Sequence, residues 1–252
     1  PPGATAPAAT RAAALPRAAG AYVATRRIPA TQATQAAAAD ARFVYAVSST
    51  TVAKHDRATG TELARSTGPA QHLNSAFVWD GKVYCAHSNY PHVPETSEIR
   101  VLDPESMRLT VFHAFERPPG SLTWAVQKGD AWWCFFAHYG KDNAASVLVR
   151  YDGEWKETGR WTCPPELVAE WGQYSLSGGV WVGDDLLVTG HDKRVVYRVR
   201  VPKEGTVLEA VEAIGSPFPG QGIAVDPAEA DTLVGISRGS AEVVFARYER
   251  KQ

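Results

Sequence analysis

The sequence predicts an all-β fold, and two observations carry that prediction. Apolar and β-branched runs of four to eight residues recur between clusters of Gly, Pro, Asp and Asn, whereas helical periodicity is scarce. One short helix is expected over Pro164 to Gly172, where proline opens the segment and glycine closes it. The second observation is a repeated unit of a strand, a turn bearing Asp or Gly, and a second strand. These hairpins begin at Gln35, Asn74, Thr123, Ser177 and Gln221.

A third and a fourth strand follow each of the first four hairpins, as in VAKHDRATGTELA and IRVLDPESMRLTVF. Four antiparallel strands repeated every roughly 40 to 50 residues are typical of β-propeller blades. The fifth unit ends after its third strand, and Ala21 to Pro29 is predicted to supply the missing fourth strand. We therefore predict a five-bladed β-propeller with four antiparallel strands per blade, closed by an N-terminal strand. A β-sandwich of Greek keys is the alternative, but it does not explain four strands per repeat.

The remaining chain organisation is simple. Residues 21–252 form one predicted domain, and residues 1–20 are rich in Ala and Pro and contain no aromatic residue. This leader has two interpretations: a disordered or trimmed end, or the mature start of an exported protein whose signal peptide has been removed. We expect export, to the periplasm or out of the cell.

Composition narrows the classes of partner. The 252 residues include 26 Lys and Arg and 27 Asp and Glu, for a net charge of -1. This balance argues against a nucleic-acid binder, and no apolar run approaches the roughly 18 to 20 residues of a membrane span. A small-molecule partner is expected, while the oligomeric state is not predicted. Cys85, Cys134 and Cys163 form no CxxC pair, so we expect no disulfide, and Cys85 and Cys134 lie in apolar strand patterns where we expect buried free thiols.

Polar residues recur where propeller blades meet the central channel. The innermost strand of each blade lines the channel, so the five residues that begin the hairpins are predicted to stand at its mouth. Histidines end the second strands of the second, third and fourth units, at His87, His138 and His191. Three neutral imidazoles with one open coordination position match a catalytic metal site, with Zn²⁺ expected. The alternatives are a metal-free polar pocket that uses the same histidines, and structural braces between blades.

Neighbouring residues suit either kind of site. Asp192 could orient His191 or act as a general base, and Lys141 and Arg238 could hold an anionic group or a developing oxyanion. A solvated loop charge is the alternative for each of them. Trp124 and Tyr139 offer aromatic surfaces for stacking a ring or a sugar. The candidate catalytic residues are Asp192, Lys141 and His72; the substrate-binding residues are Gln35, Asn74, Thr123, Trp124, Tyr139, Ser177, Gln221 and Arg238; the metal ligands are His87, His138 and His191.

The motifs HLNS, AHSNYP, SLTW, FAHYGK, SGG, TGHD and PGQGIA occur here in this order. With them the chain resembles a family of bacterial five-bladed propellers, some of them named cycloisomerases, over about Tyr22 to Arg247. It is distantly similar to the glutaminyl cyclotransferases, in which the matching inner strand reads approximately LNELE and carries a catalytic acidic residue. Here Leu73 and Asn74 are followed by SAF, so no carboxylate stands at that position.

Together these features lead us to expect an enzyme at the channel mouth. The leading hypothesis is metal-assisted hydrolysis of a small ester, lactone or phosphoester, because a bound metal lowers the pKa of water or polarises a carbonyl or phosphoryl oxygen. A sugar-acid lyase or a cyclotransferase-like enzyme is the first alternative. A non-catalytic propeller that binds a sugar or a peptide is the second.

Overall fold

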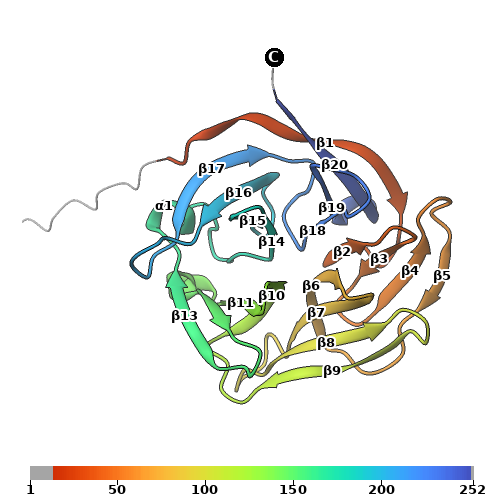
Figure 1. The fold of residues 1–252 in the computed structure, drawn as a ribbon, viewed down its shortest axis with the longest axis horizontal. Helices are drawn as coiled ribbons and strands as arrows, with labels where there is room; N and C mark the ends of the chain where they lie inside the picture. Colours follow the sequence, from red (N-terminus) through yellow and green to blue (C-terminus); the bar gives the residue numbers. More distant parts are fainter. Residues whose placement is uncertain (1–13, 251–252) are drawn as a thin grey trace, which may run out of the picture.

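The computed structural model describes residues 14–250, which form an all-β, propeller-like fold with sheets arranged around a common centre (Figure 1). Three of the sheets contain four antiparallel strands each, in the order in which the strands follow one another in the sequence. Their strands are β2 (Ala36–Ala39), β3 (Phe43–Val47), β4 (Val52–Asp56), β5 (Glu62–Arg65), β6 (His72–Trp79), β7 (Lys82–Ser88), β8 (Ser97–Asp103), β9 (Arg108–Phe115), β10 (Ser121–Lys128), β11 (Ala131–Ala137), β12 (Val147–Tyr151) and β13 (Glu157–Thr162).

The fourth sheet has eight strands and divides into two runs of four. One run is antiparallel and sequential, and the other joins the last three strands of the chain to the first one. The strands are β14 (Gly178–Val182), β15 (Asp185–Thr189), β16 (Val195–Arg200) and β17 (Glu209–Gly215), then β18 (Ala224–Val225), β19 (Thr232–Ser237), β20 (Glu242–Arg250) and β1 (Arg17–Pro29).

Strand β1 closes the ring of sheets, as the sequence predicts. It pairs antiparallel with β20 from Gly20 opposite Arg250 to Pro29 opposite Glu242, and its first residues pair parallel with β17. The strand begins four residues before the predicted start, at Arg17. Just ahead of it, Leu15 is buried in the core and the Pro16 carbonyl accepts a hydrogen bond of 2.8 Å from the Ala213 amide. The part of the predicted leader that falls in residues 1–13 lies outside the described residues.

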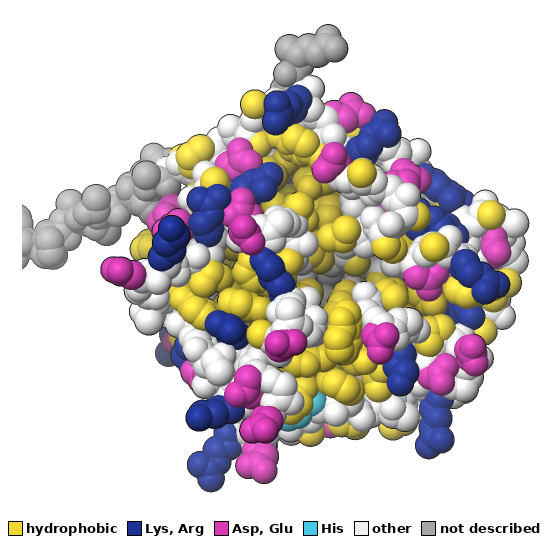
Figure 2. Space-filling model, viewed as in Figure 1, with side chains coloured by type: hydrophobic (Ala, Val, Ile, Leu, Met, Phe, Trp, Pro, Cys, Tyr) yellow, Lys and Arg dark blue, Asp and Glu magenta, His cyan; other side chains and the backbone are white. Residues whose placement is uncertain are grey.

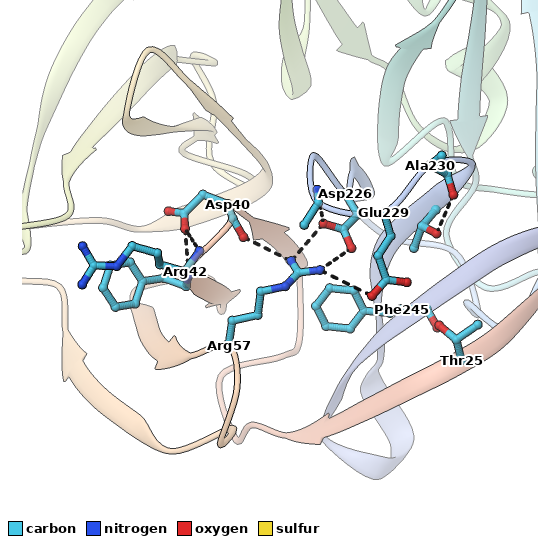
Figure 3. Close-up of polar contacts among 11 residues, drawn as sticks. Thr25, Asp40, Arg42, Arg57, Asp226, Glu229, Ala230 and Phe245 are labelled. Atoms are coloured by element: carbon cyan, nitrogen blue, oxygen red, sulfur yellow. Dashed lines mark hydrogen bonds and ion pairs between the residues drawn. The ribbon is translucent and has the colours of Figure 1, made fainter.

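A buried ion pair adds a side-chain link at the same closure (Figure 3). Arg57, in the turn after β4, donates to both carboxylate oxygens of Asp226, which follows β18, at 2.9 and 2.6 Å. The Asp226 side chain is fully buried, and the guanidinium of Arg57 also lies over the ring of Phe245. The first and last units of the chain are therefore joined by charge as well as by strand pairing.

The core lies between neighbouring sheets. Within residues 14–250, buried apolar side chains form five clusters, each drawn mainly from two adjacent units. One cluster, for example, packs Tyr84 and Ile99 of the β6–β9 sheet against Phe136 and Tyr151 of the β10–β13 sheet. Such interfaces stabilise the arrangement because each sheet buries both of its faces. The three cysteines are free and buried, as expected.

Helical structure is confined to connections between strands. The predicted helix over Pro164 to Gly172 forms only the short α1 (Pro165–Val168), and two 3-10 segments span Gly140–Ala145 and Arg238–Ser240. Within residues 14–250, no helix has both the length and the apolar character needed to cross a bilayer. Figure 2 shows hydrophobic side chains gathered towards the centre of the face in view and charged side chains around its rim.

The inner strands change character along the central channel. They begin beside polar residues such as Asn74 and Thr123, and they end beside an apolar hollow lined by Phe77, Val126 and Val180. One end of the channel therefore carries the hydrogen-bonding groups, and the other end is lined mainly by hydrophobic side chains.

Candidate functional site

A small pocket of about 120 Å³ lies at the polar end of the channel, where the inner strands begin. Every residue that starts a hairpin unit lines it, as the repeat pattern predicts. Its lining consists of Gln35, His72, Asn74, Thr123, Ser177, Gln221, Tyr139, His191 and Arg238, which the sequence singles out, and of Tyr90 and Tyr174, which it does not.

Local irregularities in the inner strands place the polar side chains. The pairing of β6 with β7 shifts register between Leu73 and Ala76, and that of β10 with β11 shifts between Leu122 and Trp124. Such a shift changes the direction in which a side chain points, because it interrupts the regular alternation of side chains along the strand. Thr123 lies in the shifted stretch. Its hydroxyl donates a 2.7 Å hydrogen bond to the carbonyl of Leu176, which ties the third unit to the fourth.

The segment before β18 approaches its neighbours closely. Gln221 has a left-handed backbone (φ 71°), and its amide N–H donates 2.9 Å to the carbonyl of Gly190. Gly222 donates 2.9 Å to the Gln35 carbonyl, and a Cβ on Gly222 would lie only 2.5 Å from the Cβ of Ala36. Glycine is therefore required where the last unit meets the first at the channel, as its position in PGQG suggests.

Three amide side chains line the pocket, and each makes a hydrogen bond to the protein. The Gln35 amide nitrogen donates to the Ser49 hydroxyl at 3.1 Å, and the Gln221 amide nitrogen donates to the His191 carbonyl at 2.8 Å. Asn74 donates 2.9 Å to the carbonyl of Leu122. A carbonyl oxygen accepts only from the N–H side of an amide, which settles the orientation of Asn74 and Gln221.

Aromatic rings form the wall of the pocket. The rings of Tyr90 and Tyr139 lie 4.7 Å apart, and His72 lies 5.5 Å from Tyr90. Tyr174 stacks on His191 with ring centroids 3.8 Å apart and planes 12° from parallel. Burial raises the pKa of Tyr139 to about 12, so its hydroxyl stays protonated at neutral pH.

The two unpredicted tyrosines differ in the signal that the sequence offers. Tyr90 follows β7 within a few residues, as Tyr139 follows β11, so the repeat itself points to it. Tyr174 lies in the connection between α1 and β14, which has no counterpart in the other units. Only the fold shows that this connection reaches the channel.

Two histidines share the pocket in different environments. Burial lowers the pKa of His72, and the positive charge of Arg238 acts in the same direction. His191 is partly exposed, and its Nδ1 lies 2.8 Å from Oδ1 of Asp192. Asp192 is outside the pocket lining, and its carboxylate is close to the His191 ring without making a hydrogen bond to it.

His87 does not reach the pocket. It is 4% exposed, and its Nε2 accepts a 3.0 Å hydrogen bond from the amide of Gln71, the residue just before His72. Its Nδ1 lies 3.2 Å from Oε2 of Glu98, which also pairs with Arg100 at 2.6 Å. Burial lowers the pKa of His87 to about 4, so the ring is a neutral imidazole at pH 7, and it holds this loop through its Nε2.

His138 is held in the same way by another loop. Its Nε2 donates a 2.7 Å hydrogen bond to the carbonyl of Pro119. Of the three histidines predicted as zinc ligands, His191 alone lines the pocket, because a neighbouring loop engages Nε2 of His87 and another engages Nε2 of His138. Within residues 14–250, no three His, Cys, Asp or Glu side chains are grouped as ligands for a metal ion. The geometry thus gives no support to the three-histidine zinc site.

Two further predicted residues lie outside the pocket. Trp124 is 1% exposed and stacks on Phe135 at 5.5 Å, so it belongs to the core between units and not to a stacking surface for a ligand. Lys141 is exposed in the 3-10 segment Gly140–Ala145 and does not line the pocket. Its predicted catalytic role has no geometric basis.

Comparison with known proteins agrees with the fold. The chain is similar to a glutaminyl cyclase from Myxococcus xanthus, with a TM-score of 0.62 and 10% sequence identity over 95% of this chain and 100% of that one. It also matches a mitotic checkpoint complex (TM-score 0.47, 10% identity, 97% and 99% coverage) and Kuenenia stuttgartiensis hydrazine synthase (0.47, 9%, 83% and 69%). No family model and no curated protein matches the sequence. At these identities the likeness shows the fold alone.

Proposed function

We propose that this chain is an enzyme that carries out acid–base chemistry on a small polar substrate bound in the central pocket. The observation that supports it most is the pairing of His191 with Asp192 at the edge of a pocket that also contains His72 and Arg238. An imidazole next to a carboxylate is a common arrangement for proton transfer, since the carboxylate orients the ring and stabilises its protonated form.

Each group has a distinct role in this proposal. His191 removes a proton from the substrate, and the Asp192 carboxylate, 2.8 Å from its Nδ1 although not aligned for a hydrogen bond, stabilises the protonated ring by its charge. Among residues 14–250, Arg238 makes a hydrogen bond only through its Nε, which donates 2.9 Å to the Thr34 carbonyl, and its terminal nitrogens are left for an anionic substrate group. Burial lowers the pKa of His72, so it is a neutral imidazole at pH 7, and its ring N–H donates a hydrogen bond to the substrate atom on which negative charge develops, while the proton taken by His191 is later released to water.

A cyclotransferase-like reaction is a second candidate. The fold likeness to the Myxococcus xanthus glutaminyl cyclase favours it, although weakly at 10% identity. The inner-strand segment that would carry an acidic residue in that group reads SAF here, and the first of these residues, Ser75, is buried. A cyclising reaction in this pocket would therefore depend on His191 as its base. Release of ammonia from a glutaminyl peptide distinguishes this candidate from the first.

We further propose that the units correspond to five blades. The five hairpin repeats, the two four-stranded runs of the large sheet and the five interfacial clusters support this count. Five blades narrow the central channel, which is consistent with the small volume of the pocket.

The proposed reaction can be tested with a panel of small esters, lactones, sugar acids and glutaminyl peptides. We expect His191→Ala to reduce turnover of any active compound about 100-fold or more, and Asp192→Asn to reduce it less. Asp142→Asn is the matched control, because Asp142 follows His138 in another unit and lies outside the pocket lining. Full activity of His191→Ala would refute the proposal. Binding of a compound without turnover by the wild type would instead favour the non-catalytic propeller that binds a sugar or a peptide.

A further inference from the structure

The amide side chains of the pocket are turned so that they offer acceptors to a ligand. The N–H groups of Gln35 and Gln221 are used by Ser49 and by the His191 carbonyl. No donor among residues 14–250 bonds to the side-chain oxygen of either glutamine, and neither oxygen is among the buried unpaired atoms of this part of the chain. Both oxygens are therefore open to a bound molecule.

Two further inner-strand residues add to this pattern. The Thr123 hydroxyl gives its hydrogen to the Leu176 carbonyl and keeps its lone pairs. Asn74 likewise uses its N–H on Leu122, and its side chain also interacts with His72. Gln35, Thr123 and Gln221, from three different units, thus present oxygen acceptors, because a hydroxyl or a carbonyl of the protein takes their hydrogens. A ligand that matches them must supply several hydrogen-bond donors.

Ammonium groups and hydroxyl groups both supply several hydrogen-bond donors, and the charge of the pocket distinguishes between them. An ammonium group would lie in a pocket whose lining contains Arg238 and no Asp or Glu. Hydroxyl groups are uncharged, so they satisfy the same oxygens without repulsion from the guanidinium. Arg238 in turn pairs best with a planar carboxylate through its free terminal nitrogens.

Size and shape complete the description. A volume of about 120 Å³ is well below the roughly 300 to 1,000 Å³ of pockets for drug-sized ligands. The rings of Tyr90, Tyr139 and Tyr174 give flat apolar walls, which fit the C–H faces of a short polyhydroxylated chain. From these features we infer that the pocket selects a short polyhydroxylated carboxylic acid, with its carboxylate at Arg238 and its hydroxyls on the ring of acceptor oxygens. This inference deepens the proposed function and rests on the same pocket.

Equilibrium binding to matched four-carbon probes tests the inference. Threonate carries a carboxylate and three hydroxyls, butyrate lacks the hydroxyls, 4-aminobutyrate replaces them with an ammonium, and erythritol lacks the carboxylate. We expect calorimetry or ligand-observed NMR to show threonate binding at least about tenfold more tightly than butyrate or 4-aminobutyrate, as two or more lost hydrogen bonds imply. Butyrate or 4-aminobutyrate binding as tightly as threonate, or no threonate binding at all, would overturn the inference.

Substitutions in the pocket test which side chain contacts which group of the ligand. Gln35→Met should weaken threonate and erythritol about five- to tenfold and leave butyrate unchanged, whereas Arg238→Gln should weaken threonate and butyrate and spare erythritol. Gln127→Met is the control, because the Gln127 amide also donates a hydrogen bond within the protein, to the Gly129 carbonyl, but lines the apolar end of the channel. Equal effects of Gln35→Met and Gln127→Met would contradict the inference.

The inferred ligand and the proposed enzymatic function can be tested separately. If threonate binds through its hydroxyls but does not react, the inferred ligand class is retained and the proposal that the chain is an enzyme is refuted. Turnover of an acid without hydroxyls, lost in His191→Ala, would do the reverse.

Discussion

Replacing His87 by alanine tests whether this histidine is a brace or part of a shared site. His87 holds the segment just before His72, because its Nε2 accepts from the Gln71 amide and its Nδ1 faces Glu98. His138 holds a different loop through the carbonyl of Pro119. The two histidines have no hydrogen-bond partner in common, so the structure predicts independent contributions to stability.

The expected cost follows from these contacts. His87→Ala removes one buried hydrogen bond and leaves Glu98 without its imidazole neighbour, which together should cost about 2 kcal/mol. For a chain of this length that lowers Tm by roughly 4 to 8 °C. His138 is less buried, and His138→Ala should cost about 1 kcal/mol.

A double-mutant cycle on the two positions, followed by urea denaturation, measures their coupling. We expect the free energies of unfolding to add within about 0.5 kcal/mol. His87→Gln, which keeps an acceptor near Gln71, should restore part of the loss. A coupling energy above about 1 kcal/mol would refute the conclusion that each histidine stabilises its own loop independently. Stoichiometric zinc binding that each single variant abolishes would also refute it.

Three other predictions follow from burial and charge. Because burial lowers the His87 pKa to about 4, stability should be full above about pH 6.5 and fall as pH drops towards 4, where the unfolded chain takes up the proton first; His87→Gln should flatten this decline in urea titrations. Arg57→Met should cost about 3 to 5 kcal/mol by stranding the buried Asp226 carboxylate, and Asp226→Leu in the same chain should recover much of it. A chain that starts at residue 19 lacks Leu15, so its free energy of unfolding should be about 2 kcal/mol lower than that of a chain that starts at residue 14. A chain that starts at residue 30 lacks β1 and should not fold, and equal melting temperatures would contradict the closure by β1.

The arrangement of strands could be read from the sequence because it depends on local repetition. Each unit begins with a polar residue before an apolar strand, so the five starting positions could be aligned and placed at one end of the channel. The pocket confirms that placement, and Gln35 and Gln221 line it from units far apart in the chain. Strand β1 could be predicted in the same way, from a unit that lacked its fourth strand.

The roles of the histidines could not be predicted in this way. His87, His138 and His191 occupy the same position in the repeat, but different incoming loops meet them. The Gln71 amide and the Pro119 carbonyl capture the first two, whereas Tyr174 stacks on His191 beside the pocket. Loop conformation depends on contacts between distant residues, and the repeat does not encode it.

The prediction that Trp124 offers a stacking surface to a ligand is wrong, and the sequence itself could have shown this. Successive side chains of a strand point to opposite faces, so Thr123 and Trp124 could not both line the channel without an irregularity. The structure contains an irregularity at this point, but it leaves Trp124 stacked on Phe135 in the core. A large aromatic residue next to a channel position is better explained by packing between sheets.

The central claim is that the pocket holds a small hydroxylated acid for proton transfer by His191. A crystal structure of the chain with threonate tests it most directly. We predict the ligand in the pocket, its carboxylate on Arg238, its hydroxyls on the side-chain oxygens of Gln35 and Gln221, and one carbon-bound hydrogen facing the His191 ring. A ligand bound elsewhere, or one in the pocket with its carboxylate turned away from Arg238, would contradict the account.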